Sequence, residues 1–188
     1  MTREQIIILQ ERIGTVADGF WGPKSKAAAE AHLRAMMPDP NPWPTPDDRS
    51  MRKFYGEAGD EKWITDIDVQ GLGVQYLGKP VKTIRAHEEC AISLRRIIER
   101  IADSPHRWVL AHYAGAYVNR PMRGGTRPSK HAYGAAIDFW PSKNGLHSYW
   151  PTKAEMPIEF MEFFSAEGWT SAGVFWSRDA QHFEATRP

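Results

Sequence analysis

Apolar positions recur with helical spacing near the start of the chain. Within residues 4–13, isoleucine and leucine fall three and four positions apart, which is the pattern of a helix with one buried face. A turn at Asp18-Gly19 separates this helix from a second one, which we expect to begin with Pro23 because proline is favoured in a first helical turn. The resulting helix-turn-helix, residues 1–37, is smaller than the roughly 40 residues that usually fold alone. We therefore expect it to dock on the rest of the chain.

Prolines dominate the next segment. Residues 38–48 read PDPNPWPTPDD, in which five of eleven residues are proline. Each proline removes a backbone donor and biases its predecessor toward an extended conformation. We predict a Pro-rich linker at residues 38–49, followed by a larger domain at residues 50–188. The alternative is an ordered arm that wraps the surface with Trp43 as its anchor.

The remaining chain alternates between one long helical pattern and several short apolar runs. The helical patterns span Val81–Ile101 and Ile158–Phe164, the second closed by Gly168; the strand candidates are Arg107–Val118, Ala135–Trp140, Trp169–Trp176 and His182–Ala185. Helices come first and short strands joined by loops come later. This order predicts an α+β fold, with a small antiparallel sheet flanked by helices and preceded by the helix-turn-helix segment.

Composition narrows the classes of function. The chain is 41% hydrophobic and 25% charged and holds eight Trp, which suits a globular protein with a sizeable core. Lys and Arg number 24 against 23 Asp and Glu, a formal charge of +1, so we expect no nucleic acid partner. The single cysteine, Cys90, excludes an intramolecular disulfide and a C-x-x-C zinc site. Any metal site must therefore use His, Asp or Glu.

The first residues carry a short apolar run between charged flanks. Ile6 to Leu9 are four apolar residues, whereas a signal peptide needs about 7–15 and a membrane span about 20. We expect no signal peptide and no membrane insertion, and we expect synthesis in the cytoplasm.

Two histidines and two aspartates stand out by their context. His131 lies in a turn-forming region that leads into an apolar strand carrying Asp138, and His182 lies near the end of the chain, three residues after Asp179. Two imidazoles and one carboxylate form a three-ligand zinc set that leaves a position for water, and Asp179 is a candidate base. Asp138 on a wet face or in a salt bridge is the plainer interpretation. The same donor set also describes non-haem iron(II) oxygenases, although those have no need of a base at Asp179.

Positive charge collects just before the first of these histidines. Residues 104–137 contain no acidic residue, and their basic residues include Arg120, Arg123 and Arg127. Near a metal, arginine can polarise a carbonyl under attack or bind a substrate carboxylate in bidentate fashion. A solvated basic loop is the alternative, which we favour for Arg123.

These residues form a recognisable pattern. Ser129 to Asp138 match S-x-H-x-x-G-x-A-x-D, and Asp179 to His182 match a later D-x-x-H. The chain in this respect resembles the zinc D-alanyl-D-alanine carboxypeptidase family, which includes vancomycin-resistance D,D-peptidases and bacteriophage endolysins that cut peptidoglycan stem peptides. The resemblance implies a hedgehog/D,D-peptidase-like fold over roughly residues 50–188.

The resemblance also implies roles and one Zn²⁺ ion as cofactor. The implied zinc ligands are His131, Asp138 and His182; the implied catalytic residues are Asp179 as base and Arg120 for the oxyanion; the expected substrate contacts are Ser129, Arg127, Tyr133 and Trp176. Asp179 departs from those members of the family that use Glu as the base.

The N-terminal segment carries a second resemblance. Leu9 to Gly14, Asp18 to Ser25 and Ala27 to Ala29 resemble the helical peptidoglycan-binding repeat, whose pattern is L-Q-x-x-L-G, then D-G-x-F-G-P-x-T, then A-A. The match stops about one helix short of the usual three.

Taken together, the motifs predict a zinc-dependent peptidoglycan hydrolase that acts on the stem peptide. The L-alanyl-D-glutamate bond cut by phage endolysins is the first expectation, and trimming of a terminal D-alanine as a carboxypeptidase is the alternative. A non-catalytic cell-wall-binding protein is the hypothesis from another class. We expect a monomer, made in the host cytoplasm and released to the wall through a holin pore.

Overall fold

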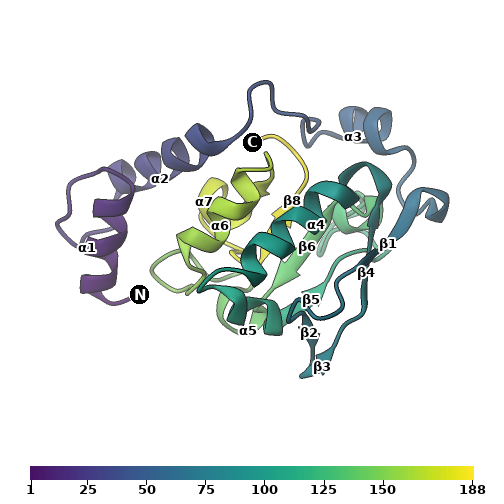
Figure 1. Cartoon of the computed structure of the whole chain (residues 1–188). Helices are drawn as coiled ribbons and strands as arrows, with labels where there is room; N and C mark the ends of the chain where they lie inside the picture. Colours follow the sequence, from purple (N-terminus) through teal and green to yellow (C-terminus); the bar gives the residue numbers. More distant parts are fainter.

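The computed structural model describes residues 1–188 and has an α+β architecture, as predicted (Figure 1). The elements follow in the order α1 (Arg3–Arg12), α2 (Pro23–Met36), α3 (Asp48–Tyr55), η1 (Glu61–Trp63), β1 (Ile64–Asp68), β2 (Gln75–Tyr76), β3 (Lys79–Pro80), β4 (Thr83–His87), α4 (Glu88–Ala102), η2 (Arg107–His112), β5 (Tyr113–Gly115), η3 (Lys130–Tyr133), β6 (Ala136–Phe139), α5 (Pro141–Asn144), α6 (Ile158–Ser165), β7 (Thr170–Ser171), α7 (Ala172–Phe175) and β8 (His182–Glu184), where η denotes a 3₁₀ helix.

The central sheet has four antiparallel strands in the order β5-β6-β8-β7. Within it, Ile137 pairs with Phe183, and Asp138 pairs with His182. Side chains alternate between the two faces of a strand, so the first pair lies on one face and the second pair on the other. The sheet therefore has one apolar face and one face that presents Asp138 and His182.

The apolar face packs on α6. Phe164 of α6 stacks on Phe183 at 4.0 Å between ring centroids, and Phe160 meets Phe139 edge to face at 5.3 Å. All four rings are fully buried, and Trp169 packs against Phe164 at 5.8 Å. This aromatic layer fixes β6 and β8 from behind, so that residues on their other face are held in position.

The long helix begins later than its sequence pattern suggests. We expected a helix from Val81, but Thr83–His87 form strand β4, which pairs with β1, and α4 starts at Glu88. Ile84 is buried on the strand, so its apolar side chain packs within the antiparallel β1–β4 pair rather than in a first helical turn. The His87 side chain accepts from the Glu89 N–H and caps the helix.

Two predicted strands are wrong over part of their length. Residues 107–112 form the 3₁₀ helix η2, and only Tyr113–Gly115 enter the sheet as β5. Residues 169–176 contain the two-residue strand β7 and then the short helix α7. Aromatic and apolar runs of this length suit either a strand or a buried helical turn, and packing decides between them.

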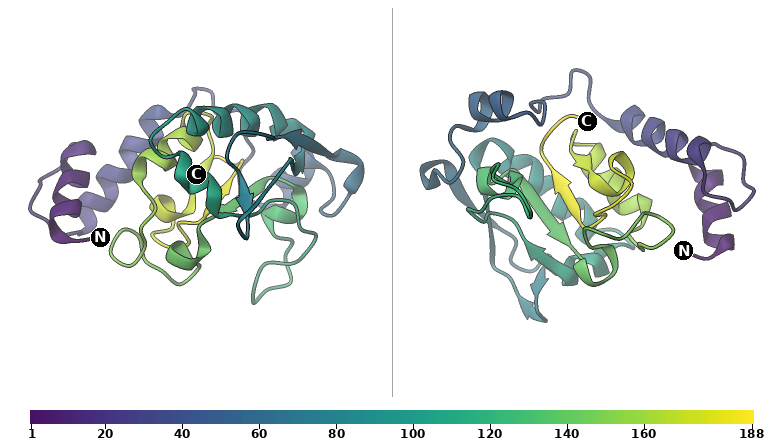
Figure 2. Two further views of the ribbon diagram at one scale, coloured as in Figure 1. Left: turned by 60° about the horizontal axis from the view of Figure 1, so that its bottom comes forward. Right: turned by 180° about the vertical axis from the view of Figure 1, so that it is seen from behind.

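The helix-turn-helix docks on the body of the molecule, as expected from its size. Leu9 and Leu33 are buried and belong to the same apolar core as the sheet, and α2 packs against α6 and α7. Arg12 and His32 both bond to Glu162 of α6, with Arg12 bidentate at 2.7 and 2.6 Å. The two helices lie along one end of the molecule (Figure 2).

The proline segment is packed against the body, which agrees with the ordered arm that we gave as the alternative to a linker. Trp43 is buried and its indole N–H donates to the Glu167 carbonyl at 2.7 Å, while the Arg187 N–H donates to the Pro44 carbonyl. The arm leads into α3, which the sequence pattern did not predict. None of the helices has the length and apolar character required to cross a bilayer.

Candidate metal centre

The polar face of the sheet brings an aspartate and a histidine together. Asp138 on β6 and His182 on β8 are directly opposite one another in the antiparallel ladder. Side chains opposite one another on the same face are immediate neighbours, and here Asp138 Oδ1 lies 2.8 Å from His182 Nδ1. The strand register alone therefore accounts for two members of the predicted ligand set.

The third member comes from the turn before β6. Ser129 caps the 3₁₀ helix η3 by accepting from the His131 N–H, and Gly134 ends it with φ +67°. A Cβ at Gly134 would lie 2.6 Å from the backbone nitrogen of His87, so only glycine fits the turn that leads into β6. The turn aims His131 Nε2 at Asp138 Oδ1, 3.3 Å away.

The three side chains form a compact cluster. One potential ligand atom from each of His131, Asp138 and His182 lies within 4.8 Å of the others. Burial opposes charge here, but hydrogen bonds from the two histidines lower the pKa of Asp138 below its usual range. Burial likewise lowers the pKa of His182, yet hydrogen bonds to Asp138 and Glu184 outweigh it and raise that pKa to about 10. The cluster thus favours positive charge at its centre, which a divalent cation would supply.

Hydrogen bonds behind the histidines leave the correct nitrogens free for a metal. His131 Nδ1 donates to the Ala116 carbonyl at 2.6 Å, which leaves Nε2 toward Asp138. His182 Nε2 lies 3.3 Å from Glu184 Oε2, which leaves Nδ1 toward Asp138. Metal-binding histidines normally donate their second N–H to a carbonyl or carboxylate in this way. The residues present therefore fit a metal with nitrogen and oxygen ligands, zinc among them.

Glu184 lines the cavity beside His182, and sequence reasoning did not assign it. It is buried on the same face of β8 as His182, two residues away, and its second oxygen accepts from the Thr186 hydroxyl at 2.6 Å. The signal was present in the sequence, because residues two apart on a strand share a face. We expected His182–Ala185 to be a strand but did not extend the alternation to Glu184.

Asp179 lies in the tight turn that precedes β8. Its backbone has φ +59°, and its carbonyl accepts from the His182 N–H at 2.9 Å, so the turn and the ligand are built together. Burial raises the pKa of the Asp179 carboxyl, and this is only partly offset by the charge of His182 and a hydrogen bond from Gln181. A carboxyl with a raised pKa beside the three candidate metal ligands is suited to proton transfer.

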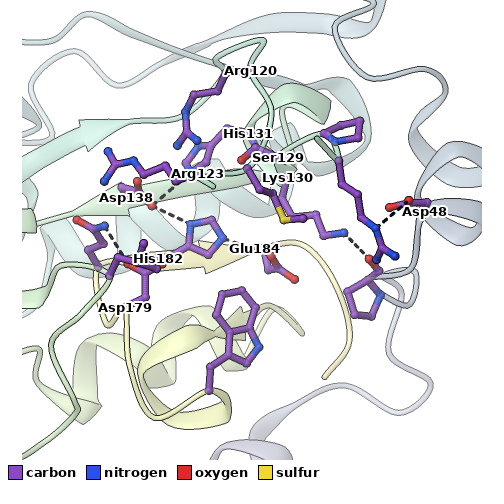
Figure 3. A pocket seen from close by; sticks show the side chains of 17 residues that line it. Asp48, Arg120, Arg123, Ser129, Lys130, His131, Asp138, Asp179, His182 and Glu184 are labelled. Carbon is purple, nitrogen blue, oxygen red and sulfur yellow. Dashed lines mark hydrogen bonds and ion pairs between the residues drawn. The ribbon is translucent and has the colours of Figure 1, made fainter. Parts of the chain in front are cut away.

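One cavity of about 350 Å³ is lined by His131, Asp138, Asp179, His182 and Glu184 (Figure 3). Basic side chains line it as well: Arg120, Arg123, Arg127 and Lys130. In Figure 3, Arg120 and Arg123 lie on the side of His131 and Asp138, whereas Lys130 extends toward Asp48 of the proline arm. Arg127 also lies near Asp48. A substrate in the cavity would therefore meet the ligand cluster flanked by positive charge on two sides.

The proline arm forms part of the cavity wall, which the sequence did not reveal. Pro46 and Asp48 line the cavity. The Lys130 ammonium donates to the Pro46 carbonyl, and Arg127 Nε lies 3.9 Å from Asp48 Oδ2. The arm is therefore connected to the same basic residues that face the ligand cluster.

The remaining predicted contacts lie in different surroundings. Ser129 lines the cavity beside His131, and Trp176 lines it with its ring centroid 5.6 Å from that of His182. Tyr133 does not line the cavity: its ring is buried at 6.5 Å from Tyr55. That position favours a role for Tyr133 in packing the turn rather than in contacting a ligand.

Comparison with known proteins adds one observation. Residues 123–185 match the family model of D-alanyl-D-alanine carboxypeptidase. The match covers about a third of the chain and includes His131, Asp138, Asp179 and His182. No curated protein and no solved structure matches the chain.

Proposed function

We propose that this chain is a zinc-dependent peptidoglycan peptidase that hydrolyses an amide bond of the stem peptide. The single observation that carries the proposal is the cluster of His131, Asp138 and His182, whose ligand atoms lie within 4.8 Å of one another in a cavity that Asp179 also lines. The match of residues 123–185 to a D-alanyl-D-alanine carboxypeptidase family model supports the same class of reaction.

The ligand set leaves room for chemistry. His131, Asp138 and His182 would hold one Zn²⁺ ion, and three protein ligands are typical of catalytic rather than structural zinc. When bound, the ion would supply a Lewis acid that polarises the scissile carbonyl and makes an attacking water more acidic. Glu184 holds the His182 ring from behind, so the nitrogen that faces Asp138 stays fixed.

Proton transfer is assigned to Asp179. In the proposed reaction its carboxylate takes a proton from the attacking water, the carbonyl carbon becomes tetrahedral, and the same proton passes to the leaving amine as the C–N bond breaks. The Arg120 guanidinium, which also lines the cavity, would stabilise the oxyanion. The raised pKa of Asp179 makes its carboxylate a stronger base for the water proton.

The bond between L-alanine and D-glutamate is the one we propose. The D-glutamate residue released by this cleavage carries a carboxylate, which Arg127 of the cavity would bind. Ser129 and Trp176 line the same cavity and would make further contacts with the substrate. A terminal D-alanine also presents a carboxylate, and the description of the matching family model favours this carboxypeptidase reaction as the second candidate. A contact with Tyr133 stays a prediction that its burial does not favour.

We further propose that the chain acts as a phage endolysin on the host wall, as a monomer released through a holin pore. Two sequence features support this role: the resemblance of the metal-site motifs to endolysin peptidases and that of residues 1–37 to a wall-binding repeat. The helical segment at 1–37, the arm at 38–49 and the catalytic domain at 50–188 are the units we propose.

Mass spectrometry of digested peptidoglycan tests the proposal. The zinc-loaded chain should release fragments with a new D-glutamate amino terminus, and chelation should stop the release. Free D-alanine would replace the endopeptidase assignment with the carboxypeptidase. A chain that holds zinc and pellets with cell walls, but releases no new amino groups, would overturn the hydrolase and favour the non-catalytic wall-binding protein.

A further inference from the structure

A second hollow, of about 620 Å³, lies between α1 and the body of the molecule. It shares no lining residue with the metal cavity. One wall is a face of α1 that includes Gln5 and Ile8, and the other wall includes Trp108 on η2 and Trp140 at the end of β6. The N-terminal helix thus encloses a groove that the catalytic proposal does not use.

The body wall of this groove is an aromatic platform. Trp108 and Trp140 meet edge to face at 4.8 Å, and the His112 ring stacks on Trp140 at 5.6 Å with an interplanar angle of 22°. Trp108 is 44% exposed although it is among the largest apolar side chains. Exposed aromatic surface gathered in a groove is typical of a binding site.

Trp140 is also held in a costly backbone conformation. Its φ is +53°, which is rare for a bulky residue, and its N–H donates to the His112 carbonyl at 2.7 Å. Such strain persists only where the surroundings enforce it, and it concentrates at functional sites. This residue with a left-handed backbone is one of the two tryptophans that line the groove.

The polar half of the lining indicates the kind of ligand. Charges of both signs are present and already paired within the chain, Arg12 with Glu162 and Glu155 with Lys143. A nucleic acid would need a surplus of positive charge, and an apolar helix would bury these groups against hydrocarbon at a cost. A neutral molecule with an apolar face and many hydroxyl and amide groups fits both halves, which describes a saccharide chain.

The groove and the metal cavity are neighbours along the surface. Arg123 and Leu146 line the metal cavity and also a third hollow of about 520 Å³, which Pro141 lines as well. Pro141 directly follows Trp140 of the aromatic platform. Trp140 lines the groove, Pro141 the third hollow and Leu146 the metal cavity, so the short segment around α5 contributes to the walls of all three hollows.

We propose that the groove between α1 and the Trp108–Trp140 platform binds the glycan strand of peptidoglycan, whose sugar rings stack on the indoles while the stem peptide enters the metal cavity. The apolar C–H face of an amino sugar would lie on the indoles, and its polar groups would meet Gln5 and the charged rim. The choice of glycan rests on the proposed function, but saccharide binding itself does not require catalysis.

Titration of the full-length chain with an N-acetylglucosamine tetramer, followed by calorimetry and by the indole N–H signals in NMR, tests this site. The signals of Trp108 and Trp140 should shift, and Trp108→Ala should weaken binding about tenfold. Trp140→Gly should do the same and is expected to fold, because glycine adopts the left-handed backbone without strain. The control is Trp63→Ala, a comparably exposed tryptophan at 39% that lies outside the groove, and it should bind as wild type does.

Two results would overturn the site: wild-type protein that does not bind the tetramer, or Trp108→Ala and Trp140→Gly proteins that bind as tightly as wild type. Folding of each variant is checked by the remaining indole signals. Saccharide binding without peptide release would keep the groove and remove the hydrolase, whereas peptide release without saccharide binding would do the opposite.

Discussion

Two clusters in this molecule join histidine to carboxylate, and they differ in what neutralises the carboxylate. At the candidate metal site, Asp138 lies between His131 and His182 with no arginine or lysine bonded to it. Where the N-terminal helices dock on α6, the Glu162 carboxylate bonds to His32 and forms a bidentate pair with Arg12. The permanently charged guanidinium of Arg12 neutralises the Glu162 carboxylate, so this second cluster needs no metal ion to balance its charge.

The difference shows how similar residues acquire different roles. Arginine stays charged at every relevant pH and fills the lone pairs of a carboxylate with its planar fork. A histidine can release a proton when a metal binds its nitrogen, and the hydrogen bonds behind His131 and His182 direct one nitrogen of each toward Asp138. We conclude that the first cluster is arranged for a cation and the second for holding helices together.

The largest effect should follow from removing the shared ligand. Asp138→Asn keeps the shape of the side chain but loses its charge, so bound zinc should fall from about one ion per chain to almost none and hydrolysis by more than about a thousandfold. Elemental analysis and the muropeptide assay measure the two losses. Asp66→Asn, at an exposed aspartate on β1, is the matched control and should change neither.

A smaller effect is expected behind the cluster. Glu184→Gln removes the negative charge that holds the His182 Nε2 proton, so zinc affinity should fall about ten- to a hundredfold while the fold is kept. Competition with a fluorescent chelator measures this. An unchanged affinity would mean that Glu184 only satisfies Thr186.

The docking cluster should affect stability rather than metal binding. Glu162→Gln breaks the pairs with Arg12 and His32, and we expect the free energy of unfolding to fall by about 1–2 kcal/mol, lowering Tm by a few degrees, with zinc content unchanged. Thermal unfolding checks this against Glu57→Gln, whose pair with Arg52 is far more exposed and should matter little. Loss of zinc from Glu162→Gln would mean that the two clusters are coupled.

The smallest effect is the pH dependence of that stability. Burial raises the pKa of Glu162, but hydrogen bonds from Arg12 and His32 outweigh it and lower the pKa below its reference value of 4.5. A lowered folded pKa contributes stability that is complete above the unfolded value and is lost as the pH falls through the folded value. The Tm difference between wild type and Glu162→Gln should therefore be constant near neutral pH and shrink below pH 4.5. A difference that grows with acid would contradict the ion-pair account.

The sequence predicted which residues form the candidate metal site more accurately than it predicted the surrounding helices and strands. His131 and Asp138 are seven positions apart, a spacing set by one turn and the start of one strand, and His182 is tied to Asp179 by a second turn. Such local geometry is readable from motifs. The boundary of α4 and the helical nature of residues 107–112 were not, because packing decides them.

Long-range wrapping was also beyond what the sequence could show. Pro46 and Asp48 reach the cavity only because Trp43 buries the arm against Glu167, far along the chain. Composition led us to predict a Pro-rich linker and to keep an ordered arm as the alternative, since prolines favour extended backbone in both. A groove between α1 and Trp108 likewise depends on how the helical segment docks.

The central claim is that the cluster hydrolyses an amide with Asp179 as the base, and Asp179→Asn tests it most directly. The substitution leaves the three ligands and the hydrogen-bonding shape in place, so the account predicts full zinc content and a rate of stem-peptide hydrolysis lower by about 10²–10⁴-fold. Zinc content and hydrolysis are measured on the same sample. A zinc-loaded Asp179→Asn protein that hydrolyses cell walls at the wild-type rate would contradict the account.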